Sequence, residues 1–313
     1  MAAHFTLKRR ITASLVIALE CLGTLLPMRW AVAIGAGIGW IAGHVVPVRR
    51  RVVDENLRAA FPDLAPRDRR RLCRDFYVHF GRWCVEYLFI SRGSAIRRGV
   101  TFTEEGQERR DALLAEGKGF ITVTGHMGSW ELMGMHFAHE GHPITVLAKP
   151  LHNGYLNRHV TRSRARSGLE VIFTGTDMSR QISERLGRGK ILCFLADQDS
   201  RQFGTFVEFM GRPASTPRGP AMYALRAGCP LFPVFTFRER GLRHRVIFGE
   251  PIRPPSDPIN TDQAIQEMMQ AYTRQLEAVI RRQPEQYFWV HRRWKTRPED
   301  IRPKRRKRAG LDP

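Results

Sequence analysis

Residues 119–132, with the sequence Gly-Phe-Ile-Thr-Val-Thr-Gly-His-Met-Gly-Ser-Trp-Glu-Leu, constrain the fold of this chain more than any other stretch. Residues 120–124 are apolar or β-branched and stand between glycines, which is typical of a buried strand. Gly125 and Gly128 allow a tight turn, and Ser129 is a residue type that often precedes the first turn of a helix. The stretch therefore predicts a strand, a turn and a helix in immediate succession.

His126 lies in that turn, and Glu131 lies in the first turn of the predicted helix. On one continuous helix these side chains would point apart, but a histidine in a turn can fold back onto a carboxylate at the helix start. Imidazole accepts a proton near neutral pH, and a carboxylate on its other nitrogen fixes its tautomer. We therefore expect His126 to be a general base that Glu131 orients, with a purely structural histidine as the alternative.

A serine beside a histidine and an acid also raises the alternative of a serine-type lipid hydrolase, with Ser129 as nucleophile. No Gly-x-Ser-x-Gly elbow surrounds Ser129, and capping of the predicted helix accounts for a serine at this position. The hydrolase is therefore kept as a rival interpretation and not as the expected one.

Alternating strand-like and helix-like segments surround this turn. Strands are expected at residues 144–148, 171–173, 191–195, 206–209, 231–237 and 244–248, and helices at residues 67–90, 103–116, 153–166, 176–186, 218–227 and 262–282. This alternation predicts an α/β fold in which helices flank a central mixed sheet. In such sheets ligands gather at the carboxyl ends of the strands, where His126 lies.

The chain begins with two apolar stretches, residues 11–28 and 30–48, and clusters of basic residues stand before and after them. We expect residues 1–50 to form a membrane-associating helical segment, either a hairpin or an interfacial pair, because the positive-inside rule keeps both basic clusters on the cytoplasmic side. Two simply buried helices are the alternative. Residues 51–298 are then the α/β domain, and the strongly basic residues 299–313 are a tail that we expect to be disordered.

The charge of the whole chain favours anionic partners. Lysine and arginine number 51 against 30 acidic residues, which gives a net charge of +21. The arginines are dispersed and follow no recognised nucleic-acid-binding motif, so anionic lipid or an acidic protein is a better match than nucleic acid. The histidines at 136, 139 and 142 lack the spacing of a zinc site, and no metal is expected.

Two acidic residues follow the apolar stretch 191–195. Asp197 and Asp199 are expected near the same sheet edge as His126, where they would position substrate or form a salt bridge with Arg218. Arg218 also precedes a predicted helix start, where an anion can bind.

Several motifs together resemble the late acyltransferases of lipid A biosynthesis. They are the strand followed by Gly-His-x-x-x-x-Glu at residues 125–131, Leu-Ala-Asp-Gln-Asp at 195–199, Ala-Ser-Thr-Pro-Arg-Gly-Pro-Ala at 214–221, and the apolar start with its arginine-rich patch. The resemblance covers most of the chain. The family also includes phosphatidylinositol mannoside acyltransferases and other glycolipid enzymes, so the resemblance leaves the acceptor open.

The resemblance implies an enzyme that moves a fatty acyl chain from an acyl carrier protein or coenzyme A thioester to a hydroxyl of a phosphorylated lipid A precursor. His126 would deprotonate that hydroxyl, and no cofactor is needed beyond the thioester. A functional arginine is expected downstream, at Arg164 or otherwise Arg162, and Ser129, Asp197, Asp199 and Arg218 are further candidates for substrate binding. The expected location is the cytoplasmic face of the inner membrane, and a different glycolipid or glycerolipid acceptor is the alternative.

Overall fold

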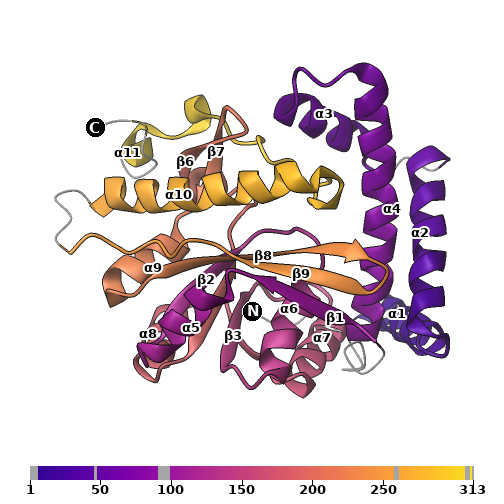
Figure 1. The fold of residues 1–313 in the computed structure, drawn as a ribbon, viewed down its shortest axis with the longest axis horizontal. Helices are drawn as coiled ribbons and strands as arrows, with labels where there is room; N and C mark the ends of the chain where they lie inside the picture. The colour runs from indigo at the N-terminus through magenta and orange to yellow at the C-terminus, as the bar shows by residue number, and fades with distance from the viewer. Residues whose placement is uncertain (1–5, 46–47, 91–98, 257–260, 307–310, 312–313) are drawn as a thin grey trace.

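A seven-stranded sheet forms the centre of the molecule, and its strands follow the order β1-β9-β8-β2-β5-β3-β4 (Figure 1). The computed structural model describes residues 6–45, 48–90, 99–256, 261–306 and 311. Neighbouring strands are parallel except for the antiparallel pair β8 and β9. The strands are β1 Thr101–Glu105, β2 Phe120–Thr124, β3 Ile144–Ala148, β4 Glu170–Phe173, β5 Ile191–Leu195, β8 Leu231–Arg240 and β9 Arg243–Phe248. The predicted α/β fold with a mixed sheet is confirmed.

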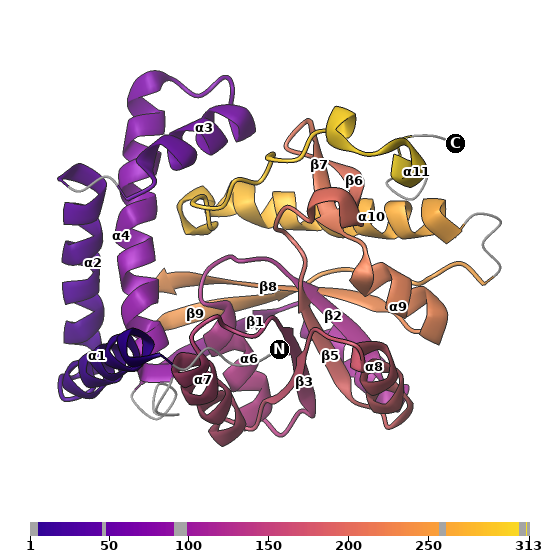
Figure 2. The same ribbon diagram turned by 180° about the vertical axis from the view of Figure 1, so that it is seen from behind.

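Helices cover both faces of this sheet. The long helix α10 crosses one face, whereas α6 and α7 lie against the other (Figures 1 and 2). A hairpin of two antiparallel strands, β6 Gly204–Phe209 and β7 Arg212–Pro217, packs on α10. The helices of this region are α5 Gln107–Ala115, α6 Trp130–His139, α7 Gly154–Arg166, α8 Met178–Gly187, α9 Gly219–Ala227 and α10 Thr261–Arg282.

The predicted helix over residues 103–116 is wrong in its first part. Thr101–Glu105 forms strand β1, which pairs in parallel with β9, and α5 begins only after Gly106. Gly106 has a φ of 81°, a left-handed conformation that ends the strand and that glycine adopts without strain. The pairing with β9 is a contact between distant parts of the chain, so the local pattern did not show it. Strand β7 was not predicted either, and the other predicted strands and helices are present with shifted ends.

Four N-terminal helices stand at one end of the sheet (Figure 1). They are α1 Leu7–Gly23, α2 Met28–His44, α3 Arg50–Ala60 and α4 Pro66–Ile90. Helix α4 is joined to the sheet by the fully buried Glu86, whose carboxylate contacts Arg238 and accepts a 3.1 Å hydrogen bond from Nε2 of His244. Burial raises the pKa of Glu86, but the charges of Arg238 and His244 outweigh it and lower that pKa overall. Glu86 is therefore an ionised anchor between α4 and strands β8 and β9.

Helices α2 and α4 touch through glycines. A Cβ built on Gly39 would lie 2.1 Å from the carbonyl oxygen of Tyr77, and one on Gly81 would lie 2.1 Å from the carbonyl oxygen of Gly35. Such spacing brings the two backbones into direct contact, as small residues do between closely packed helices. The glycines of the predicted apolar segment therefore serve helix packing.

The outer surfaces of α1 and α2 carry large exposed apolar side chains, although no helix in the described part of the chain is long and apolar enough to cross a membrane. The predicted helical form of this segment agrees with α1 and α2, and its association with a membrane stays a prediction. At the other end of the chain, Pro298–Asp300 and Pro303–Arg306 (α11) form short helical turns, and Ile301 is buried. The described part of the basic C-terminus is therefore folded, and residues 307–310 and 312–313 of the predicted tail lie outside the described residues.

Replacing Gly39 by alanine should lower the free energy of unfolding by about 1–3 kcal/mol, because its methyl group would collide with the backbone of α4. Gly37 lies in the same helix with nothing within 4 Å of its added Cβ, so Gly37→Ala is the matched control. We expect that control to be neutral or to stabilise by up to about 1 kcal/mol through helix propensity. Denaturant unfolding of both variants measures the difference, and equal stability of the two would contradict the close packing of α2 on α4.

Candidate active site

Two neighbouring parallel strands bring His126 and Asp197 together at the carboxyl edge of the sheet. In the register of β2 and β5, Thr124 lies opposite Leu195, and the backbone N–H of Ala196 donates a 3.0 Å hydrogen bond to Thr124. His126 and Asp197 each follow their strand by two residues, so they meet just beyond it. Their proximity is thus a direct result of the strand register.

Both oxygens of the Asp197 carboxylate bind His126. Oδ1 lies 2.7 Å from Nδ1 of the imidazole, and Oδ2 accepts a 2.8 Å hydrogen bond from the backbone N–H of His126. The Asp197 side chain is only 1% exposed. Burial raises the pKa of Asp197, but the charge and hydrogen bonds of His126, together with Arg293, outweigh burial and lower that pKa overall.

An ionised Asp197 selects one form of the neutral imidazole. Because a carboxylate can only accept hydrogen bonds, the shared proton sits on Nδ1, and the lone pair is left on Nε2. The side chain of His126 is 21% exposed, and Nε2 makes no hydrogen bond to any described residue. The arrangement therefore presents a proton-accepting nitrogen to an incoming molecule.

The C-terminal segment after α10 holds the turn in place. The backbone N–H of Phe288 donates to the carbonyl of His126 at 3.0 Å, and the N–H of Gly128 donates to the carbonyl of Gln286 at 3.0 Å. Gly128 has a φ of 56°, and a Cβ on it would lie 2.3 Å from the carbonyl oxygen of Thr236, so only glycine fits there. The ring of Trp130 stands edge-on to the imidazole at 4.9 Å, which leaves the histidine little freedom to rotate.

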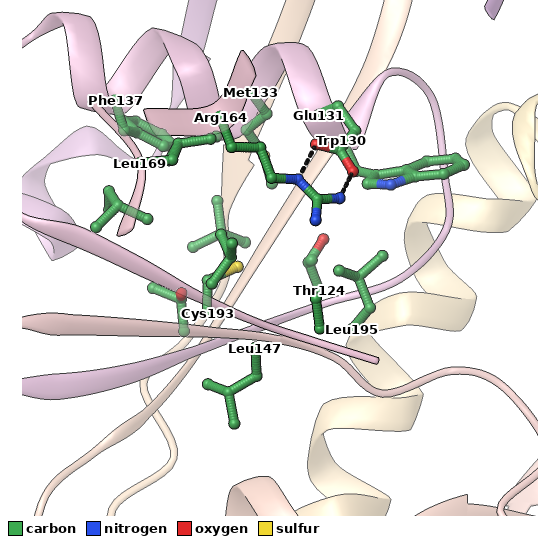
Figure 3. A pocket seen from close by; sticks show the side chains of 16 residues that line it. Thr124, Trp130, Glu131, Met133, Phe137, Leu147, Arg164, Leu169, Cys193 and Leu195 are labelled. Carbon is green, nitrogen blue, oxygen red and sulfur yellow. Dashed lines mark hydrogen bonds and ion pairs between the residues drawn. The ribbon is translucent and has the colours of Figure 1, made fainter. Parts of the chain in front are cut away.

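The predicted pairing of His126 with Glu131 is not what the structure shows. Glu131 instead binds Arg164 of α7, with Oε1 at 2.5 Å from Nη2 and Oε2 at 3.3 Å from Nε (Figure 3). Burial opposes the charge of Arg164, but Glu131 outweighs burial and raises the pKa of the guanidinium. The partners differ from the prediction because Glu131 faces the neighbouring helix α7, whereas Asp197 lies two residues after β5, the strand beside β2.

A narrow cavity of about 60 Å³ lies between the sheet and helices α6 and α7 (Figure 3). Thr122, Thr124, Glu131 and Arg164 are its polar lining, and the indole of Trp130 belongs both to its wall and to the surroundings of His126. The other lining residues are chiefly apolar: Met133, Phe137, Ile144, Val146, Leu147, Leu169, Cys193, Leu195 and Val234. An aliphatic chain is the ligand that such a wall suits.

The remaining predicted acidic and basic residues have protein partners. Asp199 accepts hydrogen bonds from the backbone N–H and the hydroxyl of Thr296, at 3.2 and 3.0 Å. The predicted salt bridge from Asp197 or Asp199 to Arg218 is wrong, because Arg218 pairs with Asp262 of α10. Asp199 thus fixes the loop after β5, and Arg218 joins α9 to α10.

Two other predicted residues lie apart from the His126–Asp197 pair. Ser129 is fully buried, makes no capping hydrogen bond, and its hydroxyl has no partner among the described residues, so the expected capping role is not seen. Arg162 is exposed on α7, and because it stands two residues before Arg164 its side chain points to a different side of the helix. No group of three or more histidine, cysteine or acidic residues in the described ranges is arranged to hold a metal ion.

One buried residue near the pair was missed. Arg293 is 2% exposed and donates to the carbonyl of Ser215 at 2.7 Å and to the hydroxyl of Thr216 at 2.5 Å, while its charge helps to lower the pKa of Asp197. The only available signal was the aromatic and basic run at residues 287–294, which follows the last long helix. Arg293 therefore ties that segment to β7 behind the site.

Comparison with known proteins shows the family to which this chain belongs. Residues 1–296 match the family described as bacterial lipid A biosynthesis acyltransferase. The chain is 28% identical to the lipid A biosynthesis lauroyltransferase of Escherichia coli K12 over 273 residues, 86% of each chain, and 27% identical to the palmitoleoyltransferase of that organism over 270 residues, 85% of each. It is also 28% identical to the phosphatidylinositol mannoside acyltransferase of Mycobacterium tuberculosis H37Rv over 193 residues, 60% of this chain and 58% of that one. The resemblance inferred from the sequence motifs is confirmed.

Proposed function

The chain belongs to the bacterial lipid A biosynthesis acyltransferase family, and we propose that it transfers a fatty acyl chain from an acyl thioester to a hydroxyl of a lipid A precursor. The observation that carries this proposal is the His126–Asp197 pair, whose Nε2 makes no hydrogen bond within the described residues and whose imidazole contacts Trp130 of the apolar cavity wall. A general base next to a site for an aliphatic chain is what transfer of a fatty acyl group to a hydroxyl requires.

His126 acts as the base in the proposed reaction. Nε2 takes the proton of the acceptor hydroxyl as the oxygen attacks the thioester carbonyl carbon, and the new C–O bond replaces the C–S bond. The proton then passes from the imidazolium to the departing thiolate. Asp197 keeps Nδ1 protonated and balances the positive charge of the imidazolium, the role first expected for Glu131.

The Glu131–Arg164 pair is the basis for a further part of the proposal, in which a guanidinium group stabilises the negative charge that develops on the thioester carbonyl oxygen. Within the described chain Arg164 uses Nε and Nη2 for Glu131, so Nη1 remains able to donate to a carbonyl oxygen as negative charge develops on it. The backbone N–H of Gly128, in the turn that carries His126, already donates to the carbonyl of Gln286. We therefore assign the stabilisation of the oxyanion to Arg164, held in place by Glu131.

The cavity in Figure 3 is proposed to receive the acyl chain. A volume of about 60 Å³ holds only a few methylene groups, so a long chain must displace flexible side chains such as Met133 and Leu147 as it enters. Both acyl carrier protein and coenzyme A thioesters present the same carbonyl to this site. Nothing in the pair or the cavity requires a cofactor besides such a donor.

A different glycolipid acceptor is the alternative that the comparisons favour. Phosphatidylinositol mannoside acyltransferases are about as identical to this chain as the lipid A enzymes, although over a shorter region. A serine hydrolase is less well supported, because the fully buried Ser129 makes no hydrogen bond to His126. Assays with a lipid A precursor and with a mannosylated lipid would separate the two acceptors.

Helices α1 and α2 are proposed to lie on the cytoplasmic face of the inner membrane. Each carries an exposed apolar stripe with helical spacing, at Leu7, Ile11, Leu15, Leu19 and Leu22 on α1 and at Trp30, Ile34, Ile38, Ile41 and Val45 on α2. Amphipathic helices with such stripes insert into the boundary between lipid headgroups and acyl chains. Lys8, Arg9 and Arg10 lie in the first turn of α1, between Leu7 and Ile11 of the stripe, and would meet anionic lipid.

Replacing His126 by alanine should lower kcat for acyl transfer by about 10²–10⁴-fold, because the general base is removed. Ser129→Ala is the matched control and should keep activity near that of the unchanged protein. Purified variants are assayed with an acyl carrier protein thioester and a lipid A precursor. Full activity of His126→Ala, or loss of activity in Ser129→Ala alone, would contradict the mechanism.

Replacing Leu19 and Ile34 together by serine should weaken binding to anionic phospholipid vesicles by more than about tenfold, because each buried side chain of this size contributes about 1.5–3 kcal/mol. Ala18 and Ala33 are exposed on the same two helices, so Ala18→Ser with Ala33→Ser is the control. Co-sedimentation with vesicles measures both. Equal binding of the two double variants would show that another surface holds the membrane.

A further inference from the structure

A second cavity, of about 670 Å³, is lined in part by the residues that directly follow Asp197 in the chain. Its wall is made by the loop that follows β5, by the C-terminal segment after α10 and by two separate basic residues. Five of its lining residues are cations: Arg49, Lys149, Arg201, Arg292 and Lys295. We call it the basic cavity.

None of these five cations forms an ion pair with a carboxylate in the described ranges. Asp199 is the one carboxylate in the wall, and its oxygens accept hydrogen bonds from Thr296 and from the backbone N–H of Arg201. Other arginines near the centre of the molecule, such as Arg164 and Arg218, do have acidic partners. The basic cavity therefore concentrates positive charge that the protein itself does not neutralise, and a bound anion would relieve that repulsion.

Two of the five cations have a costly backbone conformation. Arg49 has a φ of 54° and Arg201 a φ of 55°, and Met210 is the only other described residue besides glycine with a positive φ. A side chain in the left-handed region costs about 1–2 kcal/mol, and glycine would avoid that cost. Arg201 is held there by the hydroxyl of Ser215, which donates to its carbonyl at 2.8 Å. Strained arginines that line one cavity indicate that their side chains are needed in it.

The basic cavity adjoins the reaction centre. Gln198, Asp199, Ser200 and Arg201 line it and directly follow Asp197, whereas Thr124 and Leu195 of the apolar cavity come just before the pair in their strands. The backbone N–H of Asp199 also donates a 2.9 Å hydrogen bond to Nε2 of His291, which lines the basic cavity. The two chain segments that carry the pair thus contribute residues to both an apolar cavity and a cationic one.

We propose that the basic cavity binds a phosphate-bearing headgroup of the acceptor lipid while the acceptor hydroxyl reaches His126. Arginine guanidinium groups match phosphate oxygens in charge and geometry, and a cavity of this volume holds a phosphorylated sugar. The identification of the bound molecule as the acceptor rests on the proposed acyl transfer. The binding of a phosphate in this cavity does not.

Two observations favour the acceptor over the phosphates of the donor. Arg49 immediately precedes α3, five residues after the end of α2, and the apolar stripe of α2 is the surface proposed to face the lipid in which an acceptor resides. The cations also line a concave cavity, which suits a small headgroup. Binding of an acidic carrier protein would instead require cations on an open, protruding surface.

The test measures binding of glucosamine 1-phosphate by isothermal titration, with glucosamine as the comparison that lacks the phosphate and 3′-phosphoadenosine 5′-phosphate as the donor fragment. Arg201→Gln with Arg292→Gln removes two charges from the cavity. The control removes two exposed charges elsewhere, Arg188→Gln with Arg274→Gln. We expect the cavity variant to bind the sugar phosphate at least about tenfold more weakly than the unchanged protein, and the control variant to bind it as the unchanged protein does. Glucosamine is expected to bind to none of the three proteins.

The proposal is overturned if the unchanged protein gives no heat with millimolar glucosamine 1-phosphate, if both double variants weaken binding equally, or if only the donor fragment loses affinity in the cavity variant. A turnover assay separates this proposal from the function itself. A raised KM for the acceptor with an unchanged KM for the donor in the cavity variant supports both the phosphate site and the proposed acyl transfer. Sugar-phosphate binding without any acyl transfer would refute the proposed function and leave the phosphate site standing.

Discussion

The two hydrogen bonds from His126 to the carboxylate of Asp197 are the interaction on which the candidate site depends. One comes from Nδ1 of the ring and the other from the backbone N–H of the same residue, so the carboxylate fixes both the turn and the tautomer. Strands β2 and β5 are neighbours in parallel register, which places the two residues side by side without any further adjustment. A buried carboxylate kept ionised by this contact leaves Nε2 as the basic nitrogen.

Three surfaces of the molecule suit different parts of the proposed substrates. The apolar stripes of α1 and α2 are suited to lipid, the cavity under α6 to an aliphatic chain, and the basic cavity to a phosphate. The glycine contacts of α2 with α4, and the anchor from Glu86 to Arg238, join the first of these surfaces rigidly to the sheet.

Local patterns in the sequence were sufficient for the strand, the turn and the position of His126, because each depends on residues next to one another. The identity of its acidic partner was not accessible in that way. Glu131 is nearer along the chain, but the order of strands in the sheet brings Asp197 to the imidazole, and α7 brings Arg164 to Glu131. The same reason explains strand β1, which forms only because β9 lies beside it, and Arg218, whose acidic partner is on α10. Motif spacing drew attention to His126, Asp197 and Arg164, and the sheet topology decided which groups they contact.

The most direct measurement of the central claim is the tautomer of His126, read by nuclear magnetic resonance of the protein labelled with ¹⁵N at histidine and assigned with a His126→Gln variant. Neutral His126 is expected to carry its proton on Nδ1 in the unchanged protein and in Glu131→Gln. In Asp197→Asn that preference should weaken, because an asparagine offers one acceptor oxygen for two N–H groups. A tautomer that changes in Glu131→Gln and stays the same in Asp197→Asn would contradict the account.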